Sequence, residues 1–189
     1  MTLLGRPRWR TVLTTLLLAG ALLTSSPATA APSADKAVTT SRITWNGLDG
    51  ARPGMNIYKA ANLIGAYVER ACNYDYVSGL PAGVYLNNVM FDNGRLMWQM
   101  TTTSAVAGPS GLKVGMTKKA AMRRLKTAGL KVRGQLSSET GKIDTWWAKG
   151  PEGRVVWFRL SYDAPRLSEV SLAPNRRAAL RLMQHQGGC

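Results

Sequence analysis

The sequence predicts an α+β fold made of two tandem repeats, each a short helix or helix pair packed on an antiparallel β-sheet. Three observations lead to this prediction. Gly54-Met55-Asn56 is followed 61 residues later by Gly115-Met116-Thr117. A run with helical spacing of apolar residues follows each motif, with Ala60 and Ala121 at matching positions. Stretches typical of β-hairpins then follow each predicted helix.

The N-terminal 30 residues have the pattern of a secretory signal peptide. Three arginines within residues 6–10 precede an apolar run over residues 11–23, which leads to Ala28-Thr29-Ala30. Cleavage is expected after Ala30. The run is shorter than the roughly 20 residues needed to span a bilayer, and an uncleaved N-terminal anchor is the alternative. We therefore expect a secreted, extracellular protein with no transmembrane segment in the mature chain.

Positive charge is concentrated in the second half of the chain. Residues 31–189 hold 22 basic and 10 acidic residues, a formal charge of +12. Residues 31–107 have six basic and five acidic residues, whereas residues 108–189 have 16 and five. Such a field attracts polyanions and steers acidic partners toward the second half. The alternative is that the charge serves solubility.

The first repeat is predicted to span residues 43–107, after a disordered arm over residues 31–42 that is rich in Ala, Ser and Pro. Asn56 is a predicted N-cap, because its side-chain oxygen can accept from the free N–H groups of a first helical turn. Apolar spacing continues that helix to Ile64, and a second short helix is predicted over Ala66 to Ala71.

A β-hairpin is predicted at the end of the first repeat. Two β-prone runs, Val84 to Phe91 and Arg95 to Thr101, flank Asp92-Asn93-Gly94. Asn-Gly is favoured in the two-residue turns of hairpins, because both central residues need a positive φ.

The second repeat is predicted to span residues 108–174 and to follow the same plan. Thr117 is the expected N-cap of a helix that runs to about Thr127. The turn Gly150-Pro151-Glu152-Gly153 occupies the place of Asp92-Asn93-Gly94. Strands are predicted at Lys131–Leu136, Thr145–Lys149, Arg154–Tyr162 and Leu167–Leu172. Residues 175–189 form a last helix, from Asn175 to Gln184, and a tail.

The duplicated motif resembles that of the β-lactamase-inhibitor-protein family, and its half-motif also occurs in small outer-membrane assembly lipoproteins. The matching residues are Gly54, Met55 and Asn56, and then Val114 to Thr117, within a region from about Ile43 to Ala173. The resemblance implies helix pairs packed on four-stranded antiparallel sheets, with a concave sheet face that grips an enzyme target.

The chain departs from that family in its cysteines. The family pairs cysteines within each repeat, whereas this chain has Cys72 in the first repeat and Cys189 as its last residue. An even pair of cysteines in an exported protein predicts a disulfide, here closing a long loop. The alternative is an intermolecular disulfide through the tail.

The second repeat contains a group of predicted partner-binding residues. Successive strand residues face opposite sides of a sheet, so Trp146 and Trp147 cannot both lie in a helix-covered core. Aromatic residues and Arg supply most of the binding energy at protein interfaces. The predicted binding face comprises Trp146, Trp147, Trp157, Arg159 and Tyr162. The alternative is a second core layer that the other repeat covers.

A basic patch is predicted on the helix of the second repeat: Lys118, Lys119, Arg123, Arg124 and Lys126. The two lysines lie in the first turn, where the helix dipole disfavours positive charge by about 0.3–1 kcal/mol each. An acidic partner would explain this choice, and a solvated helix face is the alternative. Nucleic acid is disfavoured, because the chain has an export signal and lacks a nucleic-acid recognition motif.

No catalytic, cofactor or metal site is predicted. His185 is the only histidine and lies in the tail, which excludes a site with two imidazole ligands. Two carboxylate pairs, Asp144 with Glu152 and Asp163 with Glu169, are explained more simply by turns. We therefore expect a secreted, non-catalytic binding protein for an extracellular protein partner, with a hydrolase such as a β-lactamase as one candidate. The alternatives are a protein bound to an anionic cell-envelope polymer and, more weakly supported, a small secreted hydrolase.

Overall fold

The structure is a computed structural model that describes residues 42–71, 74–89, 98–136 and 143–184. Several features named above lie outside these residues: the predicted signal peptide, the predicted arm except for Arg42, the Asp92-Asn93-Gly94 turn, both cysteines and His185.

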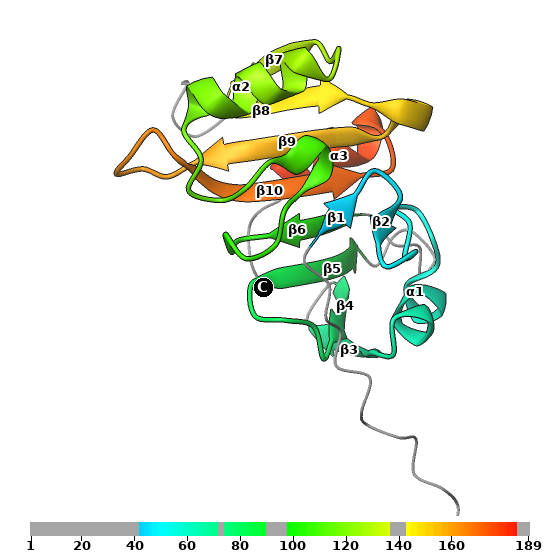
Figure 1. The fold of residues 1–189 in the computed structure, drawn as a ribbon. Coiled ribbons are helices and arrows are strands. Elements are labelled where there is room, and N and C mark those ends of the chain that lie inside the picture. The colour runs from blue at the N-terminus through cyan, green and yellow to red at the C-terminus, as the bar shows by residue number, and fades with distance from the viewer. Residues whose placement is uncertain (1–41, 72–73, 90–97, 137–142, 185–189) are drawn as a thin grey trace, which may run out of the picture. The chain divides into compact units, whose positions relative to one another are not determined.

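Eight of the described strands form one antiparallel sheet (Figure 1). Their order across the sheet is β3-β4-β5-β6-β10-β9-β8-β7, so β6 and β10 meet in the middle. The strands in the first part of the chain are β3 (Tyr67–Ala71), β4 (Tyr74–Ser78), β5 (Val84–Val89) and β6 (Trp98–Thr101). Those in the second part are β7 (Val132–Leu136), β8 (Ile143–Lys149), β9 (Val155–Leu160) and β10 (Leu167–Ala173).

Three α-helices lie among the described residues: α1 (Ile57–Leu63), α2 (Lys118–Thr127) and α3 (Arg176–Gln184). A small hairpin, β1 (Ile43–Thr44) with β2 (Gly47–Leu48), precedes α1. Short 3-10 turns occupy Pro109–Gly111 and Pro151–Gly153. The predicted α+β class is confirmed, as are the predicted strands of the second half, apart from small differences at their ends.

The predicted second helix over Ala66 to Ala71 is wrong, because this segment is strand β3. It pairs along its whole length with β4, from Tyr67 opposite Ser78 to Ala71 opposite Tyr74. Ala66 and Ala71 favour a helix, but the segment between them begins with Tyr67 and Val68, which favour a strand. The backbone pairing with β4, a strand that the sequence did not predict, decides the outcome.

The two Gly-Met motifs begin α1 and α2 with the same local geometry. Gly54 has a φ of +83° and Gly115 a φ of +82°, a conformation that a residue with a Cβ adopts only with strain. Met55 and Met116 each pack against the hydrophobic core beneath the helix that follows. The glycine therefore turns the chain, and the methionine fills the space under the helix.

Both predicted N-caps are confirmed. The Asn56 side-chain oxygen accepts hydrogen bonds from the backbone N–H groups of Tyr58, at 3.0 Å, and Lys59, at 3.2 Å. The Thr117 hydroxyl accepts one from the backbone N–H of Ala120, at 3.3 Å. These bonds satisfy donors that a first helical turn leaves free.

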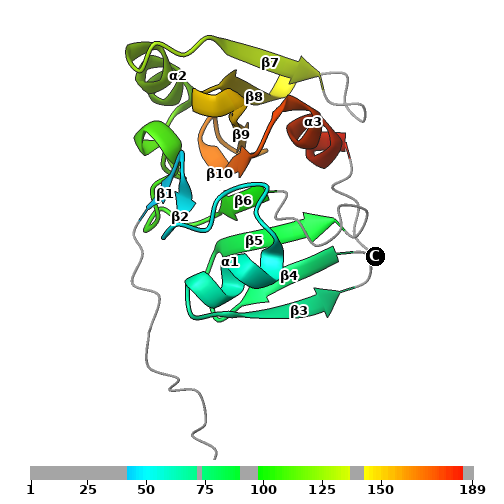
Figure 2. The same ribbon diagram turned by 90° about the vertical axis from the view of Figure 1, so that its right-hand side faces the viewer.

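The helices pack on opposite faces of the sheet. Buried residues of α1 pack against β4 and β5, and those of α2 pack against β8, β9 and β10 on the same face. Ala178, Ala179 and Leu182 of α3 pack on the other face, against Trp147 and Trp157. Figure 2 shows α2 and α3 on opposite sides of β8, β9 and β10.

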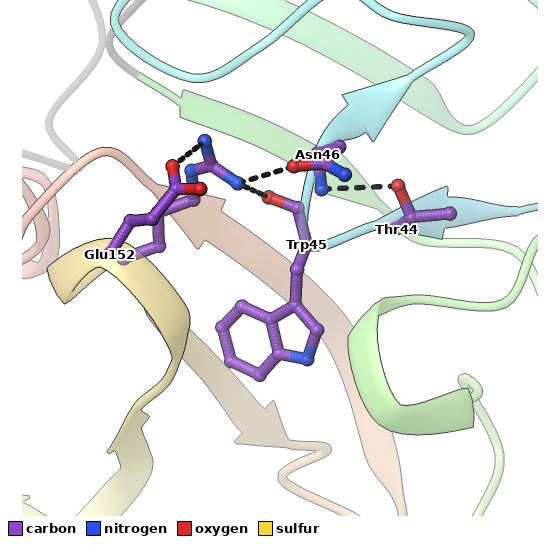
Figure 3. A network of polar contacts seen from close by, with 5 residues as sticks. Thr44, Trp45, Asn46 and Glu152 are labelled. Carbon is purple, nitrogen blue, oxygen red and sulfur yellow. Dashed lines mark hydrogen bonds and ion pairs between the residues drawn. The ribbon is translucent and has the colours of Figure 1, made fainter.

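The β1–β2 hairpin is held to the turn between β8 and β9 by a buried arginine (Figure 3). Arg154 donates to the backbone oxygen of Trp45, at 2.5 Å, and to the side-chain oxygen of Asn46, at 2.8 Å. Its other terminal nitrogen lies 2.5 Å from a Glu152 carboxylate oxygen. The Thr44 hydroxyl accepts from the backbone N–H of Asn46. Segments more than 100 residues apart in sequence are thus joined by one side chain.

Candidate partner-binding face

The sheet face opposite α1 carries a row of tyrosines. In β4, Val77 belongs to the core under α1, so Tyr74 and Tyr76 point to the other face. In β5, the buried Val84 and Leu86 likewise place Tyr85 on that face.

Strand β3 extends this surface to the edge of the sheet. Val68 packs against the core on the α1 side, and its neighbours Tyr67 and Glu69 therefore face away from α1. Tyr67 is 60% exposed, Tyr85 42% and Tyr74 37%. We name this surface the tyrosine face and define it by Tyr67, Tyr74, Tyr76 and Tyr85.

Helix α3 lies on the same side of the sheet but over different strands. Its apolar residues contact Trp147, Val155, Trp157 and Ala173, which belong to β8, β9 and β10. Among the described residues, no helix packs on the tyrosine face. Rigid strands thus present exposed aromatic rings.

One hydrogen bond and one aromatic pair order the centre of the tyrosine face. The Tyr76 hydroxyl donates a hydrogen bond to a Glu69 carboxylate oxygen. The rings of Tyr74 and Tyr76 lie 6.1 Å apart between centroids, within the range of favourable aromatic pairs. The hydrogen bond to Glu69 raises the pKa of Tyr76. Hydrogen bonds lower the pKa of Glu69, with the larger effect from Tyr76 and a smaller one from Ser78.

The predicted tryptophan face differs from what the structure shows. Trp146 and Trp147 do lie on opposite faces, as alternation requires, in the cores under α2 and α3. The expectation that Trp147 or Trp157 lies on an open surface is wrong: Trp147 is 6% exposed and Trp157 is fully buried. They lie in a second core layer, and helix α3, not the other repeat, covers it. Trp98 extends this layer, with its ring centroid 6.3 Å from that of Trp157.

The other two predicted contact residues are separated. Arg159 is half-buried on the α3 side of β9, and its Nε donates to the Thr145 hydroxyl at 3.5 Å. Tyr162 lies beyond the end of β9 and is 90% exposed. The structure therefore does not bring Trp146, Trp157 and Tyr162 together on one surface.

Two members of the predicted basic patch have partners within the chain. The Lys118 ammonium lies 3.9 Å from the centroid of the Trp146 ring, a cation–π contact. Arg124 donates a hydrogen bond to the backbone oxygen of Gly111, at 3.0 Å. Lys119, Arg123 and Lys126 are exposed. The contact with Trp146 explains a lysine in the first turn without an acidic partner.

The carboxylates that the sequence offered as pairs have simpler roles. Asp144 accepts a hydrogen bond from the Thr145 hydroxyl, at 2.8 Å, and Glu152 pairs with Arg154. Within residues 42–184, leaving out the gaps noted above, no group of three or more His, Cys, Asp and Glu is arranged to hold a metal ion. None of the described helices has the length and apolar character needed to cross a membrane.

The chain matches no protein-family model, and neither a characterised protein nor a solved structure is detectably similar to it. Its function must therefore be inferred from its own surface chemistry.

The tyrosine face is the site that the sequence prediction missed. Its signal is the alternation of Tyr67 with Val68, of Tyr74 and Tyr76 with Val77, and of Tyr85 with its buried neighbours. The prediction of a helix over residues 66–71 concealed that alternation.

Proposed function

We propose that this protein is a secreted, non-catalytic binding protein that recognises a protein partner through the tyrosine face. The observation that carries the proposal is the set of exposed tyrosines on one open face of β3, β4 and β5. Tyrosine offers a large, rigid and amphipathic contact surface at a low cost in side-chain entropy, which is why binding surfaces are enriched in it.

We further propose that the two halves are tandem copies of one unit, similar to the repeats of β-lactamase inhibitor proteins. Two features support this: α1 precedes β3–β6 as α2 precedes β7–β10, and the two Gly-Met motifs share backbone geometry and capping. On this basis the partner is an extracellular hydrolase, and a β-lactamase is the first candidate to test.

The charge of the second half supports a role in steering the partner. An excess of 11 positive charges over residues 108–189 accelerates encounter with an acidic protein, while the tyrosine face supplies the contacts that hold it. A binding role rather than a catalytic one also fits the sequence, because the only histidine lies in the tail.

Affinity capture with matched variants tests the proposal. The purified protein is immobilised and exposed to concentrated culture supernatant and solubilised envelope, and then washed from about 0.1 to 1 M salt, where the Debye length falls to roughly 3 Å. We expect a protein retained through the highest salt. The Tyr67→Ala/Tyr85→Ala variant is expected to weaken its binding by about 30-fold or more, because the loss of even one hot-spot aromatic residue costs about 2 kcal/mol or more.

The control is Tyr58→Ala/Tyr162→Ala. It removes two tyrosines that are 50% and 90% exposed but lie on α1 and in the loop after β9. Equal retention by both double variants would overturn the assignment of the tyrosine face. Broad release of acidic polymers at low salt would instead favour the cell-envelope alternative. The retained protein, and purified β-lactamases, are then assayed for inhibition.

A further inference from the structure

A cavity of about 260 Å³ lies on the second half of the chain, away from the strands of the tyrosine face. Trp147 and four cationic side chains line it: Lys131, Arg133, Lys149 and Arg176. None of the described residues that line it is acidic. Arg133 belongs to β7, and Lys131 immediately precedes that strand. Trp147 and Lys149 belong to β8, and Arg176 is the first residue of α3.

Two arginines are held on the same indole ring. Arg133 lies directly opposite Trp147 in the pairing of β7 with β8. The guanidinium carbon of Arg133 is 5.5 Å from the centroid of the Trp147 ring, and that of Arg176 is 5.4 Å from it. Both distances fall within the range of cation–π contacts. The buried Trp147 thus fixes two guanidinium groups from different elements beside one cavity.

Among the described residues, no carboxylate forms an ion pair with these four cations. Two ion pairs between described residues, Arg70 with Asp75 and Arg154 with Glu152, lie outside the cavity. Gathering four positive charges around a concave surface is unfavourable unless solvent or an anion compensates them. Clefts lined by one sign of charge also concentrate ions of the opposite sign.

We propose that this cavity binds a phosphate group. Two guanidinium groups provide planar pairs of N–H donors that match phosphate oxygens. Lys131 and Lys149 add two further positive charges, which favour a phosphate dianion over a singly charged carboxylate. The cavity is slightly smaller than the roughly 300–1,000 Å³ of sites for drug-sized ligands, so it fits a compact head group. The phosphate can be a free ion or part of a polymer.

Titration calorimetry of the purified full chain tests this site, with inorganic pyrophosphate as the free source and short-chain polyphosphate as the polymeric source. We expect one saturable site per chain. Arg133→Gln/Arg176→Gln should weaken binding by about a hundredfold or more, since each charge-assisted hydrogen bond is worth about tenfold. If only polyphosphate binds and this variant abolishes its binding, the polymer is the source.

The matched control is Arg123→Gln/Arg181→Gln, which removes the same charge from two exposed arginines outside the cavity. It should weaken binding by about twofold at most, through the long-range field alone. Lys131→Gln/Lys149→Gln provides a second test that leaves the Trp147 contacts intact in case the arginine variant fails to fold. The proposal is overturned if neither ligand binds, or if cavity and control variants lose affinity equally. Because the tyrosine variants do not touch this cavity, its failure is distinguishable from failure of the proposed function.

Discussion

At the scale of single residues, the hydrogen bond between Tyr76 and Glu69 links the ionisation of two groups on the tyrosine face. The pKa of Tyr76 is raised, so this side chain stabilises the fold below the pKa of a free tyrosine, about 10, and that stabilisation is lost as pH rises through the folded-state pKa. The pKa of Glu69 is lowered, so its contribution is present above the pKa of a free glutamate and is lost as pH falls through the folded-state value.

We predict that Glu69→Gln lowers the pKa of Tyr76 toward the ordinary value of tyrosine. The amide still accepts a hydrogen bond, but it lacks the negative charge that disfavours the tyrosinate. NMR titration of the tyrosine ring carbons measures this change. Asp163→Asn, an exposed carboxylate in the loop after β9, is the control and should leave the Tyr76 titration in place. An unchanged Tyr76 titration in Glu69→Gln would contradict the prediction.

The tryptophans illustrate what residue patterns can and cannot predict. Alternation along β8 correctly places Trp146 and Trp147 on opposite faces, because it is a property of the strand itself. The burial of Trp147 depends on where α3 packs. That position is set by the contacts that Ala179 and Leu182 make with distant strands. The sequence shows α3 as a helix but not the face it covers.

At the scale of elements, the β1–β2 hairpin depends on contacts with a distant turn. Its two strands comprise only two residues each, too few to be stable alone. Arg154 bonds to Trp45 and Asn46, and the Trp45 ring packs so closely on Gly150 that a Cβ there would lie 2.3 Å from ring atoms. The turn before β9 is therefore the anchor of the hairpin.

We predict that Arg154→Ala lowers the free energy of unfolding by about 1.5–3 kcal/mol. The variant removes charge-assisted hydrogen bonds to Trp45 and Asn46 and leaves the backbone oxygen of Trp45 without its arginine donor. Urea denaturation followed by tryptophan fluorescence measures the loss. Arg177→Ala, an exposed arginine on α3, should change stability by no more than about 0.5 kcal/mol. A similar loss in both variants would show that the network is not a specific anchor.

Element prediction succeeded where local chemistry decides the structure. Asn56 and Thr117 begin helices because capping needs only a side-chain oxygen and the next few N–H groups. It failed for β3, because the backbone pairing of residues 67–71 with β4 outweighs local preference. The missed strand pair is also the one that carries three of the four residues of the tyrosine face.

At the scale of the whole molecule, β10 connects all three hydrophobic clusters. Leu172 packs in the core under α1, Val170 in the core under α2, and Ala173 in the core under α3. The strand also pairs with both β6 and β9. Residues of β10 are therefore buried by both halves of the sheet, and disrupting either half exposes some of them.

We predict that the described fold unfolds in a single cooperative transition. Calorimetric and van't Hoff enthalpies should agree, and tyrosine and tryptophan signals should change together. Val170→Ala should lower the midpoint of both signals equally, because the cavity that it leaves weakens the shared strand. Two separate transitions, or a shift confined to one signal, would contradict this prediction and indicate that the halves are independent.

The central position of β10 also has a consequence for how the protein is made. Strand β10 is made after the other seven strands of the sheet, yet it must enter between β6 and β9. Until residue 173 has emerged, β6 and β9 each present an open edge of the kind that pairs with other chains. A premature stop before Leu167 would therefore yield a product that aggregates rather than a smaller folded protein, because the sheet is complete only once residue 173 has been made.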